Sequence, residues 1–293
     1  MSPTKLASTA PIIQLIRASG QLACRVRNTG TVWHTSPMAD SRSMQIVLGG
    51  SGSGLLKSLN PIEKNTARGA ILYDGQLLDQ IDEAWFDAAY WHQHGSVVNI
   101  AEGRGTTLIV QAAAGAWVLR HFQRGGLVAK PFKDRYFWRR ADATRAFREW
   151  RLLAELFARG LPVPRPVAAR FERSGIWYRG DLITSYLPNT QSLAALLDIG
   201  HQEEPVWEHI GRVLRRFHDE GVDHADLNAH NILLDDDGEV FIVDFDRGAI
   251  RAPGGWKKRN LDRLERSLRK LATQRGGAFP AVGWRALCLA YEG

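Results

Sequence analysis

One polar stretch, residues 224–248, concentrates the side chains that are best suited to chemistry. It reads HADLNAHNILLDDDGEVFIVDFDRG, and His224, Asp226 and Asn231 fit the pattern H-x-D-L-x-x-x-N. A further carboxylate, Asp244, follows at the end of the next apolar run. In phosphoryl transfer a protein orients an acceptor hydroxyl, accepts its proton and holds Mg²⁺ on a triphosphate. Asp226 on a short loop suits the first two tasks, and Asn231 with Asp244 offers the hard oxygen ligands that Mg²⁺ prefers.

A hairpin with polar ends is the competing interpretation of this stretch. It accounts well for the DDDGE turn, which contains the hairpin-favouring pair Asp237-Gly238. A plain hairpin gives no reason for Asp226 and Asn231 at their spacing, or for Asp244 inside VDFD. We therefore favour a phosphoryl-transfer site.

A glycine pair further upstream could approach phosphate. In AEGRGTTLIV, Gly103 and Gly105 stand one residue apart between two predicted strands. Backbone amides at glycine can come close to phosphate because no Cβ intervenes. Taken alone, the motif is more typical of an ordinary hairpin turn, and it lacks the third glycine of the usual kinase loop. Its position ahead of a strand pair, a helix and the Asp226 loop favours phosphate binding.

Two charged residues between these motifs could anchor a nucleotide. Kinases place a Lys on the third strand and a Glu on the following helix for this purpose. Glu149 in FREWRLL is the candidate for the Glu, and Arg120 in WVLRHF stands where the Lys is expected. Arg can hold phosphate through its fork of donors. Lys130 or Lys133 could instead supply the cation, and a surface role is the alternative for Arg120.

The first half of the chain predicts the elements that must position the glycine pair and Glu149. Residues 95–122 contain β-branched runs broken by glycines, which predicts three strands joined by turns. Residues 141–160 then predict a helix that closes at Gly160. Its apolar face carries Phe147, Trp150, Ala154 and Phe157.

Beyond Pro188 the sequence becomes helical. Residues 260–274 predict one helix, and residues 205–221 predict another, with a proline in its first turn. The apolar stripe of the latter is Val206, Ile210, Val213 and Phe217.

A strand-rich half followed by a helix-rich half predicts an α+β fold with two lobes. We expect an N-lobe over residues 44–187, with the glycine loop, and a C-lobe over residues 188–293, with the catalytic loop. Residues 1–43 are rich in Ser, Thr and Ala and show little periodicity. All three methionines lie at positions 1, 38 and 44, so we expect residues 1–43 to be disordered or to be a mis-started extension.

The composition of the 293-residue chain, with 44% hydrophobic and 24% charged residues, is ordinary for a soluble globular protein. No run approaches the roughly 18 apolar residues that a membrane-spanning helix needs. The formal charge of +7 indicates an anionic partner. Nucleic acid, nucleotide phosphates and an acidic lipid surface all fit that charge. Basic residues cluster over residues 119–140 and 247–270.

With these residues in view, the chain resembles the lipopolysaccharide kinase branch of the protein-kinase-like superfamily. More narrowly it resembles the 3-deoxy-D-manno-octulosonic acid kinases. The resemblance extends from about residue 69 to residue 275. It is carried by GAILYD, GRGTTL, WVLRHFQRGGLVAKPFKDRYFW, FREWRLLAELFARGLPVPRPVAA, HADLNAHNILLD, DFDRG and NLDRLERSLRK.

The resemblance implies a two-lobed protein-kinase-like fold, the cofactors ATP and Mg²⁺, and a role for each candidate residue. Asp226 becomes the catalytic residue, and Asn231 and Asp244 become the metal ligands. His224 would brace the loop, and the backbone at residues 186–188 would meet adenine. The residues implied to bind the nucleotide are Gly103, Arg104, Gly105, Arg120 and Glu149.

Several departures from protein kinases point to a different acceptor. Asn228 stands where a protein kinase usually has Lys, Asp246 replaces the Gly of Asp-Phe-Gly, and no Ala-Pro-Glu follows. These departures disfavour protein substrates and favour a sugar. The resemblance implies that the enzyme phosphorylates the 4-hydroxyl of 3-deoxy-D-manno-octulosonic acid on lipid A precursor, in lipopolysaccharide core biosynthesis.

The resemblance also gives the basic clusters a partner. It implies a peripheral protein at the cytoplasmic face of the inner membrane, in contact with an anionic membrane surface and with no nucleic acid. Phe137, Trp138 and Trp256, which lie among basic residues, could hold the head group and touch the interface. Burial in the core is the alternative for each Trp.

Two classes of alternative stay open at this point. One is a related kinase with another acceptor, such as a heptose of lipopolysaccharide, an aminoglycoside, choline or a protein. The other is a non-catalytic kinase-like module or a basic RNA-binding protein. A module without activity has no chemical need for Asp226, Asn231 and Asp244 together.

Overall fold

The chain divides into two compact units, Met1–Ser53 and Gly54–Gly293. In the first unit the described part is an antiparallel hairpin of β1 (Ile13–Ala18) and β2 (Gln21–Val26). The extension predicted over residues 1–43 lies largely outside the described residues and stays a prediction. The computed structural model describes residues 13–18, 21–26, 58–101, 107–123, 134–200 and 203–293.

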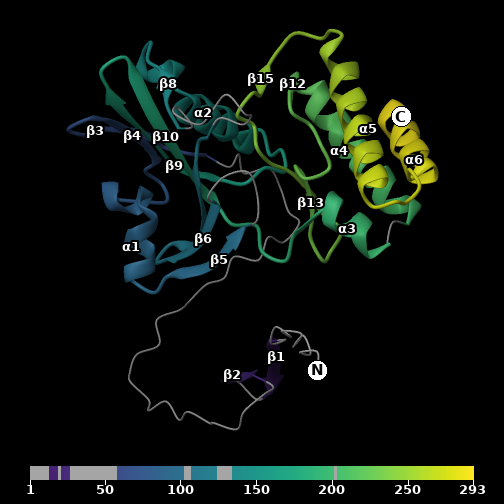
Figure 1. Cartoon of the computed structure of the whole chain (residues 1–293), viewed down its shortest axis with the longest axis horizontal. Coiled ribbons are helices and arrows are strands. Elements are labelled where there is room, and N and C mark those ends of the chain that lie inside the picture. The colour runs from purple at the N-terminus through teal and green to yellow at the C-terminus, as the bar shows by residue number, and fades with distance from the viewer. Residues whose placement is uncertain (1–12, 19–20, 27–57, 102–106, 124–133, 201–202) are drawn as a thin grey trace, which may run out of the picture. The chain divides into compact units, whose positions relative to one another are not determined.

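An antiparallel sheet forms the first part of the second unit (Figure 1). Its strands follow the order β3-β4-β9-β10-β7-β6-β5, and the short strand β8 pairs with the first residues of β10. The strands are β3 (Pro61–Asn65), β4 (Gly69–Asp74), β5 (Val97–Ala101), β6 (Thr107–Ala112), β7 (Gly115–His121), β8 (Tyr136–Phe137), β9 (Pro166–Ser174) and β10 (Trp177–Ser185).

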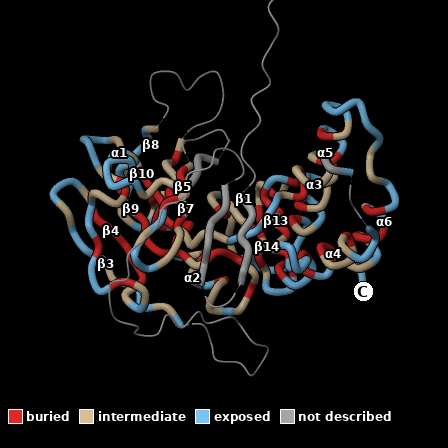
Figure 2. The backbone as a smooth tube through the Cα atoms, turned by 90° about the horizontal axis from the view of Figure 1, so that it is seen from below, coloured by how far each residue is buried: buried red, intermediate tan, exposed pale blue. Residues whose placement is uncertain are grey.

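Alternation along the central strands gives this sheet two apolar faces. In β4, Ala70 and Leu72 belong to one buried cluster, whereas Ile71 and Tyr73 belong to the other. Successive side chains of a strand point to opposite faces, so a continuous apolar run such as GAILY is buried on both sides. Figure 2 shows the resulting concentration of buried positions along β4 and β9.

One face of the sheet is covered by helix α2 (Arg145–Ala158), which packs on β9 and β10. The helix ends where predicted, because Gly160 takes a left-handed conformation with φ 71°. Phe147 and Trp150 are fully buried as expected. The buried stripe continues through Leu153 and Leu156, while Ala154 and Phe157 are only partly buried.

The other face is covered by the 3₁₀ helix η1 (Glu83–Phe86) and helix α1 (Ala88–Gln93). Trp117 of β7 lies at the centre of this cluster, with the rings of Trp85 and Trp91 at 5.5 and 6.1 Å from it. The strands that carry the site are therefore packed on both sides.

Helices dominate the second part of the unit. They are α3 (Leu193–Ile199), α4 (Glu204–Asp219), α5 (Trp256–Gln274) and α6 (Ala281–Glu292). Pro205 lies in the first turn of α4, and Ile210, Val213 and Phe217 are buried, as the apolar stripe predicts. Helices α4 and α6 approach closely because Gly283 faces Trp207, where a Cβ would lie 2.2 Å from the indole nitrogen.

Short strands carry the polar stretch. They are β11 (Gln191–Ser192), β12 (Val222–Asp223), β13 (Ile232–Leu234), β14 (Val240–Ile242) and β15 (Ala249–Ile250). Strands β13 and β14 form the hairpin predicted from DDDGE, and Gly238 has φ 81° in its turn. The sheet precedes the helices along the chain, which confirms the prediction of a two-lobed α+β fold.

A buried histidine makes the stability of this fold depend on pH. His218 of α4 is 2% exposed, and its Nδ1 lies 2.7 Å from the Tyr291 hydroxyl. Burial is the main cause that lowers the pKa of His218 from 6.5 to about 4. Between these values the unfolded chain binds a proton that the folded chain does not. The stabilisation is therefore present above pH 6.5 and is lost as the pH falls towards 4.

Because of His218, we expect the free energy of unfolding to be about 2 kcal/mol lower at pH 5 than at pH 7.5. Urea unfolding of the wild type and of His218→Asn at both pH values measures this difference. The variant should lack that part of the pH dependence, whereas the exposed control His92→Asn should keep it. An unchanged pH dependence in His218→Asn would contradict the assignment.

Candidate active site

The loop between β12 and β13 presents Asp226 on a rigid turn. The Asp226 carbonyl accepts hydrogen bonds from the side-chain amides of Asn228 at 2.8 Å and Asn231 at 3.1 Å. Backbone bonds from Leu227 to His224 and from Asn231 to Asn228 close the turn further. The Asp226 side chain itself is 42% exposed. Its backbone is fixed while its carboxylate faces solvent, which suits a group that must meet an acceptor hydroxyl.

His224 joins this loop to the end of β14. The buried ring places Nε2 2.9 Å from the carbonyl oxygen of Val243, so Nε2 is the nitrogen that donates. Burial lowers the pKa of His224, which favours the neutral ring. The ring also lies 4.6 Å from that of Phe245. His224 thus braces the loop, as we predicted.

The two predicted metal ligands lie next to paired strands, Asn231 just before β13 and Asp244 just after β14. The backbone N–H of Val243 donates to the carbonyl of Asn231 at 3.0 Å, which brings Asp244 alongside the loop. Asp244 has a positive φ of 66°, which is uncommon for a residue other than glycine. Such strain persists only where the surroundings fix the backbone. Here His224 and Glu149 hold the residues on either side of Asp244.

Arg120 connects the sheet, the helix and Asp244. Its Nη2 pairs with Glu149 of α2, and its Nη1 pairs with Asp244. The other oxygen of Glu149 accepts from the backbone N–H of Phe245 at 3.0 Å. Three segments that lie far apart in sequence therefore meet at one guanidinium.

The charged groups at this junction shift one another's pKa values. Burial raises the pKa of Glu149 to about 7, against the opposing effect of Arg120. Burial also acts to raise the pKa of Asp244, but the charge and hydrogen bond of Arg120, together with the charges of His224 and Arg145, outweigh it and the pKa falls below the ordinary value. Burial disfavours the charge on Arg120, yet Glu149 and Asp244 together raise its pKa. Asp244 is accordingly held as a carboxylate, the form that can ligate a cation.

A second arginine, Arg145 of α2, supports the same segment and was not predicted from the sequence. Arg145 forms an ion pair with Asp246, two residues beyond Asp244. Arg145 and Glu149 are four residues apart and therefore lie on one face of the helix. The four-residue spacing of Arg145 and Glu149 is the sequence signal that could have identified Arg145, since residues on one helix face can contact the same segment, here Asp244–Asp246.

Helix α5 supports the Asp226 loop and the strand before it at three regularly spaced points. Asn260 donates to Asp223 at 2.9 Å, Arg263 forms an ion pair with Asp226, and the Ser267 hydroxyl accepts from the N–H of Ala229 at 3.2 Å. These helix residues recur every three or four positions, so they share one face. From the sequence only a basic cluster was recognised here, and a role for Arg263 was not predicted.

Three of the predicted nucleotide ligands, Gly103, Arg104 and Gly105, lie outside the described residues. Lys130 and Lys133, the alternatives to Arg120, do so as well. At the predicted adenine-binding segment, the N–H of Tyr186 donates to the carbonyl of Ala116 at 2.9 Å. This bond ties the connection between the two lobes to the start of β7.

The donor set at Asn231 and Asp244 fits Mg²⁺. The amide nitrogen of Asn231 is used on Asp226, so its amide oxygen is the group available to a cation. Asp244 adds a carboxylate, and Mg²⁺ in phosphate-transferring sites typically takes only one or two such ligands beside phosphate and water. In the described part of the chain no cluster of three or more His, Cys, Asp or Glu could hold a metal.

The three aromatic side chains predicted to touch a membrane differ in exposure. Phe137 is 58% exposed, whereas Trp138 is partly buried with its ring 5.0 Å from that of Phe171. Trp256 is only 4% exposed, and its ring packs 5.2 Å from His218. The prediction was wrong for Trp256, because the first turn of α5 places it in the core.

The arrangement combines a carboxylate on a rigid loop, two oxygen ligands and an Arg–Glu pair, and these groups suit phosphoryl transfer. The family model described as "Lipopolysaccharide kinase (Kdo/WaaP) family" matches residues 88–291. The chain belongs to the lipopolysaccharide kinase family. The predicted family is thereby confirmed, and so is the prediction that the protein is a kinase.

Similar members of the lipopolysaccharide kinase family come from several bacteria. A protein of Xylella fastidiosa (strain M23) is 43% identical over 235 residues, which cover 80% of this chain and 94% of that protein. A protein of Xanthomonas euvesicatoria pv. vesicatoria (strain 85-10) is 44% identical over 237 residues, with the same two coverages. A protein of Stenotrophomonas maltophilia (strain K279a) is likewise 44% identical over 237 residues. All three are named 3-deoxy-D-manno-octulosonic acid kinase.

The contribution of the Arg120–Glu149 ion pair to the stability of this lipopolysaccharide kinase can be measured. Arg120→Met leaves Glu149, which is 2% exposed, without its counter-charge. Breaking a buried pair from one side costs about 3 kcal/mol, so we expect the free energy of unfolding to fall by that amount. Urea unfolding measures it.

Arg148→Met is the matched control, since Arg148 is an exposed residue of the same helix, and it should cost less than about 0.5 kcal/mol. Adding Glu149→Gln to Arg120→Met should recover part of the loss, because the unpaired charge is then gone. Equal stabilities of the two Met variants would contradict the junction.

Proposed function

We propose that this chain transfers the γ-phosphoryl group of ATP to the 4-hydroxyl of 3-deoxy-D-manno-octulosonic acid on lipid A precursor. The observation that carries the proposal is the junction of Arg120, Glu149 and Asp244 beside the Asp226 loop, in a chain at least 43% identical to kinases named for this sugar. The new bond joins the sugar oxygen to phosphorus. The bond from phosphorus to the β-phosphate oxygen breaks, and ADP leaves.

Asp226 would orient the acceptor hydroxyl and accept its proton as the new bond forms. The structure favours Asp226 because its carboxylate is exposed while two amide side chains fix its backbone. A positioned base of this kind contributes about 10²- to 10⁴-fold to a rate.

Asn231 and Asp244 would hold Mg²⁺ through their side-chain oxygens. Bound there, Mg²⁺ would neutralise charge on the phosphate oxygens. Arg120, oriented by Glu149, would present its guanidinium to the phosphates, and Gly103, Arg104 and Gly105 would cover them with backbone amides. The backbone at residues 186–188 would receive the adenine.

Arg263 supports an acidic acceptor. Its guanidinium lies against Asp226, at the place where the acceptor must approach, and it is 43% exposed. A sugar acid that places its hydroxyl on Asp226 can offer its carboxylate to Arg263, since arginine binds carboxylates through two parallel hydrogen bonds. We propose that Arg263 binds the carboxylate of the acceptor.

A lipid-linked acceptor implies that the enzyme works as a peripheral protein at the cytoplasmic face of the inner membrane. Every helix in the described ranges is too short or too polar to cross a bilayer. The formal charge of +7 favours an anionic surface.

The first test of the proposal is transfer of labelled phosphate from ATP with Mg²⁺ to lipid A precursor that carries one such sugar. Wild type should label this lipid and not the precursor that lacks the sugar. Asp226→Ala should lower the rate by about 10²-fold or more, because the acceptor loses its base.

Asp236→Ala is the matched control, since Asp236 is an exposed carboxylate in the turn of the neighbouring hairpin and should leave the rate unchanged. Label on neither lipid would reject this acceptor. Full activity of Asp226→Ala would reject the role of Asp226.

The second test separates the acceptor from the nucleotide. Arg263→Gln should raise KM for the sugar-bearing acceptor about tenfold, because a charge-assisted pair with its carboxylate is lost, while KM for ATP stays constant. Steady-state kinetics with each substrate varied in turn give both values. Arg266→Gln, an exposed arginine three residues further along α5, is the control. Parallel changes in both KM values would contradict a role specific to the acceptor.

A further inference from the structure

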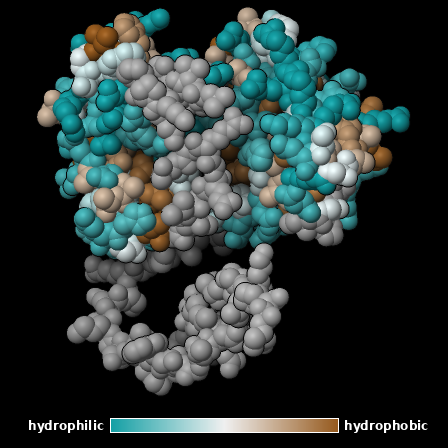
Figure 3. All heavy atoms as spheres, in the orientation of Figure 1, coloured by the Kyte–Doolittle hydropathy of each residue, from teal (hydrophilic) through white to brown (hydrophobic). Residues whose placement is uncertain are grey.

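An apolar tip projects from the sheet at strands β8, β9 and β10. The turn between β9 and β10 exposes Ile176 at 59%, and the neighbouring β8 exposes Phe137 at 58%. These two residues are joined through the strands, since Phe137 pairs with Trp177 and the N–H of Trp138 donates to the carbonyl of Ile176 at 2.9 Å. In Figure 3, apolar residues appear among hydrophilic ones at the corner where Figure 1 labels β8. We call Phe137 and Ile176, with the turn between β9 and β10, the apolar tip.

The tip is unusual for a hairpin turn. Turns of two residues are normally polar, and Gly175, with φ 60°, already meets the backbone requirement here. Nothing in the turn geometry calls for an exposed isoleucine beside it. Exposed apolar groups rimmed by polar residues are typical of contact surfaces.

Exposed arginines follow or precede the strands of the apolar tip or line the hollow beside it, and we call them the arginine rim. They are Arg68, Arg135, Arg139, Arg140, Arg173 and Arg179. Two of them are paired, Arg68 with Glu172 at 2.8 Å and Arg179 with Asp134 at 2.7 Å. Among the described residues, Arg135, Arg139 and Arg140 form no ion pair, so the rim has excess positive charge.

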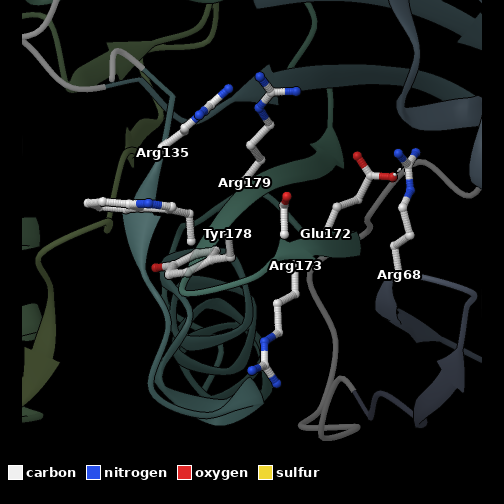
Figure 4. A pocket seen from close by; sticks show the side chains of 8 residues that line it. Arg68, Arg135, Glu172, Arg173, Tyr178 and Arg179 are labelled. Atoms are coloured by element: carbon white, nitrogen blue, oxygen red, sulfur yellow. Dashed lines mark hydrogen bonds and ion pairs between the residues drawn. The ribbon is translucent and has the colours of Figure 1, made fainter. Parts of the chain in front are cut away.

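The rim also encloses a hollow. A shallow cavity of about 200 Å³ is lined by Arg68, Arg135, Arg173 and Arg179, together with Glu172 and Trp177. Figure 4 shows Arg135 and Arg179 extending in the same direction, while Arg68 turns towards Glu172. Two guanidinium groups side by side can hold one phosphate group, because each supplies a fork of donors.

We propose that the apolar tip and the arginine rim form the surface by which this protein docks on an anionic phospholipid bilayer. Phe137 and Ile176 enter the boundary between head groups and acyl chains, and the rim binds lipid phosphates around them. A bilayer matches this pattern because it offers apolar depth beneath a layer of anionic groups. A nucleic acid would match the charge but would not require an isoleucine at the tip.

The docking surface is connected to the candidate active site through α2. The hydroxyl oxygen of Tyr178, which follows Trp177 in β10, accepts from the N–H of Arg145 at 3.1 Å. Arg145 in turn pairs with Asp246 beside the predicted metal ligand. Docking at the tip thus fits an enzyme whose acceptor is part of a membrane, and in this respect the inference rests on the proposed function.

Sedimentation with vesicles tests the surface without relying on catalysis. Wild type should bind vesicles of phosphatidylglycerol and phosphatidylethanolamine, bind phosphatidylcholine vesicles much more weakly, and lose binding as salt increases. Phe137→Ser/Ile176→Ser should weaken binding to the anionic vesicles about tenfold or more, because two apolar contacts are lost. Arg135→Gln/Arg139→Gln should do the same, because two charges near the surface are removed.

Two further exposed apolar residues, Val282 and Leu289, supply matched controls. Val282→Ser/Leu289→Ser on α6, where the two side chains are 65% and 60% exposed, should bind like wild type, as should Arg212→Gln on α4. Equal binding by all variants, equal binding to neutral vesicles, or no binding by wild type would each overturn the proposal. In the last case the surface would instead belong to a protein partner.

Kinase assays separate this proposal from the proposed function. The tip and rim variants should phosphorylate a water-soluble, acyl-free acceptor sugar at the wild-type rate and should lose rate only on acceptor embedded in anionic vesicles. Vesicle binding without activity on either acceptor would reject the sugar assignment and keep the docking surface. If the tip variants phosphorylate both acceptors at the wild-type rate, the docking surface is rejected and the proposed function stands.

Discussion

The candidate active site depends on one guanidinium that joins three separate segments. Arg120 comes from a central strand packed on both faces, Glu149 from the helix that covers the sheet, and Asp244 from the end of a hairpin over a hundred residues later. Glu149 is almost completely buried, and an unpaired charge there would be costly. The ion pairs of Arg120 with Glu149 and Asp244 therefore require the helix, the sheet and the Asp244 segment to be assembled together. Because the guanidinium is a planar fork, it can contact both carboxylates through different nitrogens, which a single ammonium does less well.

The rest of the site is assembled by two helices that use one face each. On α2, Arg145 and Glu149 hold the segment from Asp244 to Asp246. On α5, Asn260, Arg263 and Ser267, spaced three and four residues apart, hold the Asp226 loop. Val243 then connects the loop to the Asp244 segment, because its carbonyl accepts a hydrogen bond from His224 and its N–H donates one to the carbonyl of Asn231. Rigid elements thus fix the backbone on both sides of the two carboxylates, as a site that must position reacting groups requires.

Much of this organisation could be predicted from the sequence, and the reason lies in local patterns. The strands around Gly115, helix α2 with its end at Gly160, the proline at the start of α4 and the hairpin at Gly238 all follow from signals within a few residues. Arg263 could not be predicted in this way, because its pairing with Asp226 joins residues 37 positions apart and depends on how α5 packs. Trp256 was misplaced for the same reason, since a basic neighbourhood in sequence does not show which side of a helix faces the core.

Two groups of arginines in the described part of the chain differ in their burial. Arg120 and Arg145 are mostly covered and bind carboxylates of their own chain, so they contribute to the shape of the site. Arg135, Arg139 and Arg140 are exposed and form no ion pair within the described residues, so they contribute little to the fold. Exposed arginines beside exposed apolar side chains offer no evident gain in stability. The presence of these arginines on either side of β8 is better explained by an external partner than by the needs of the sheet itself.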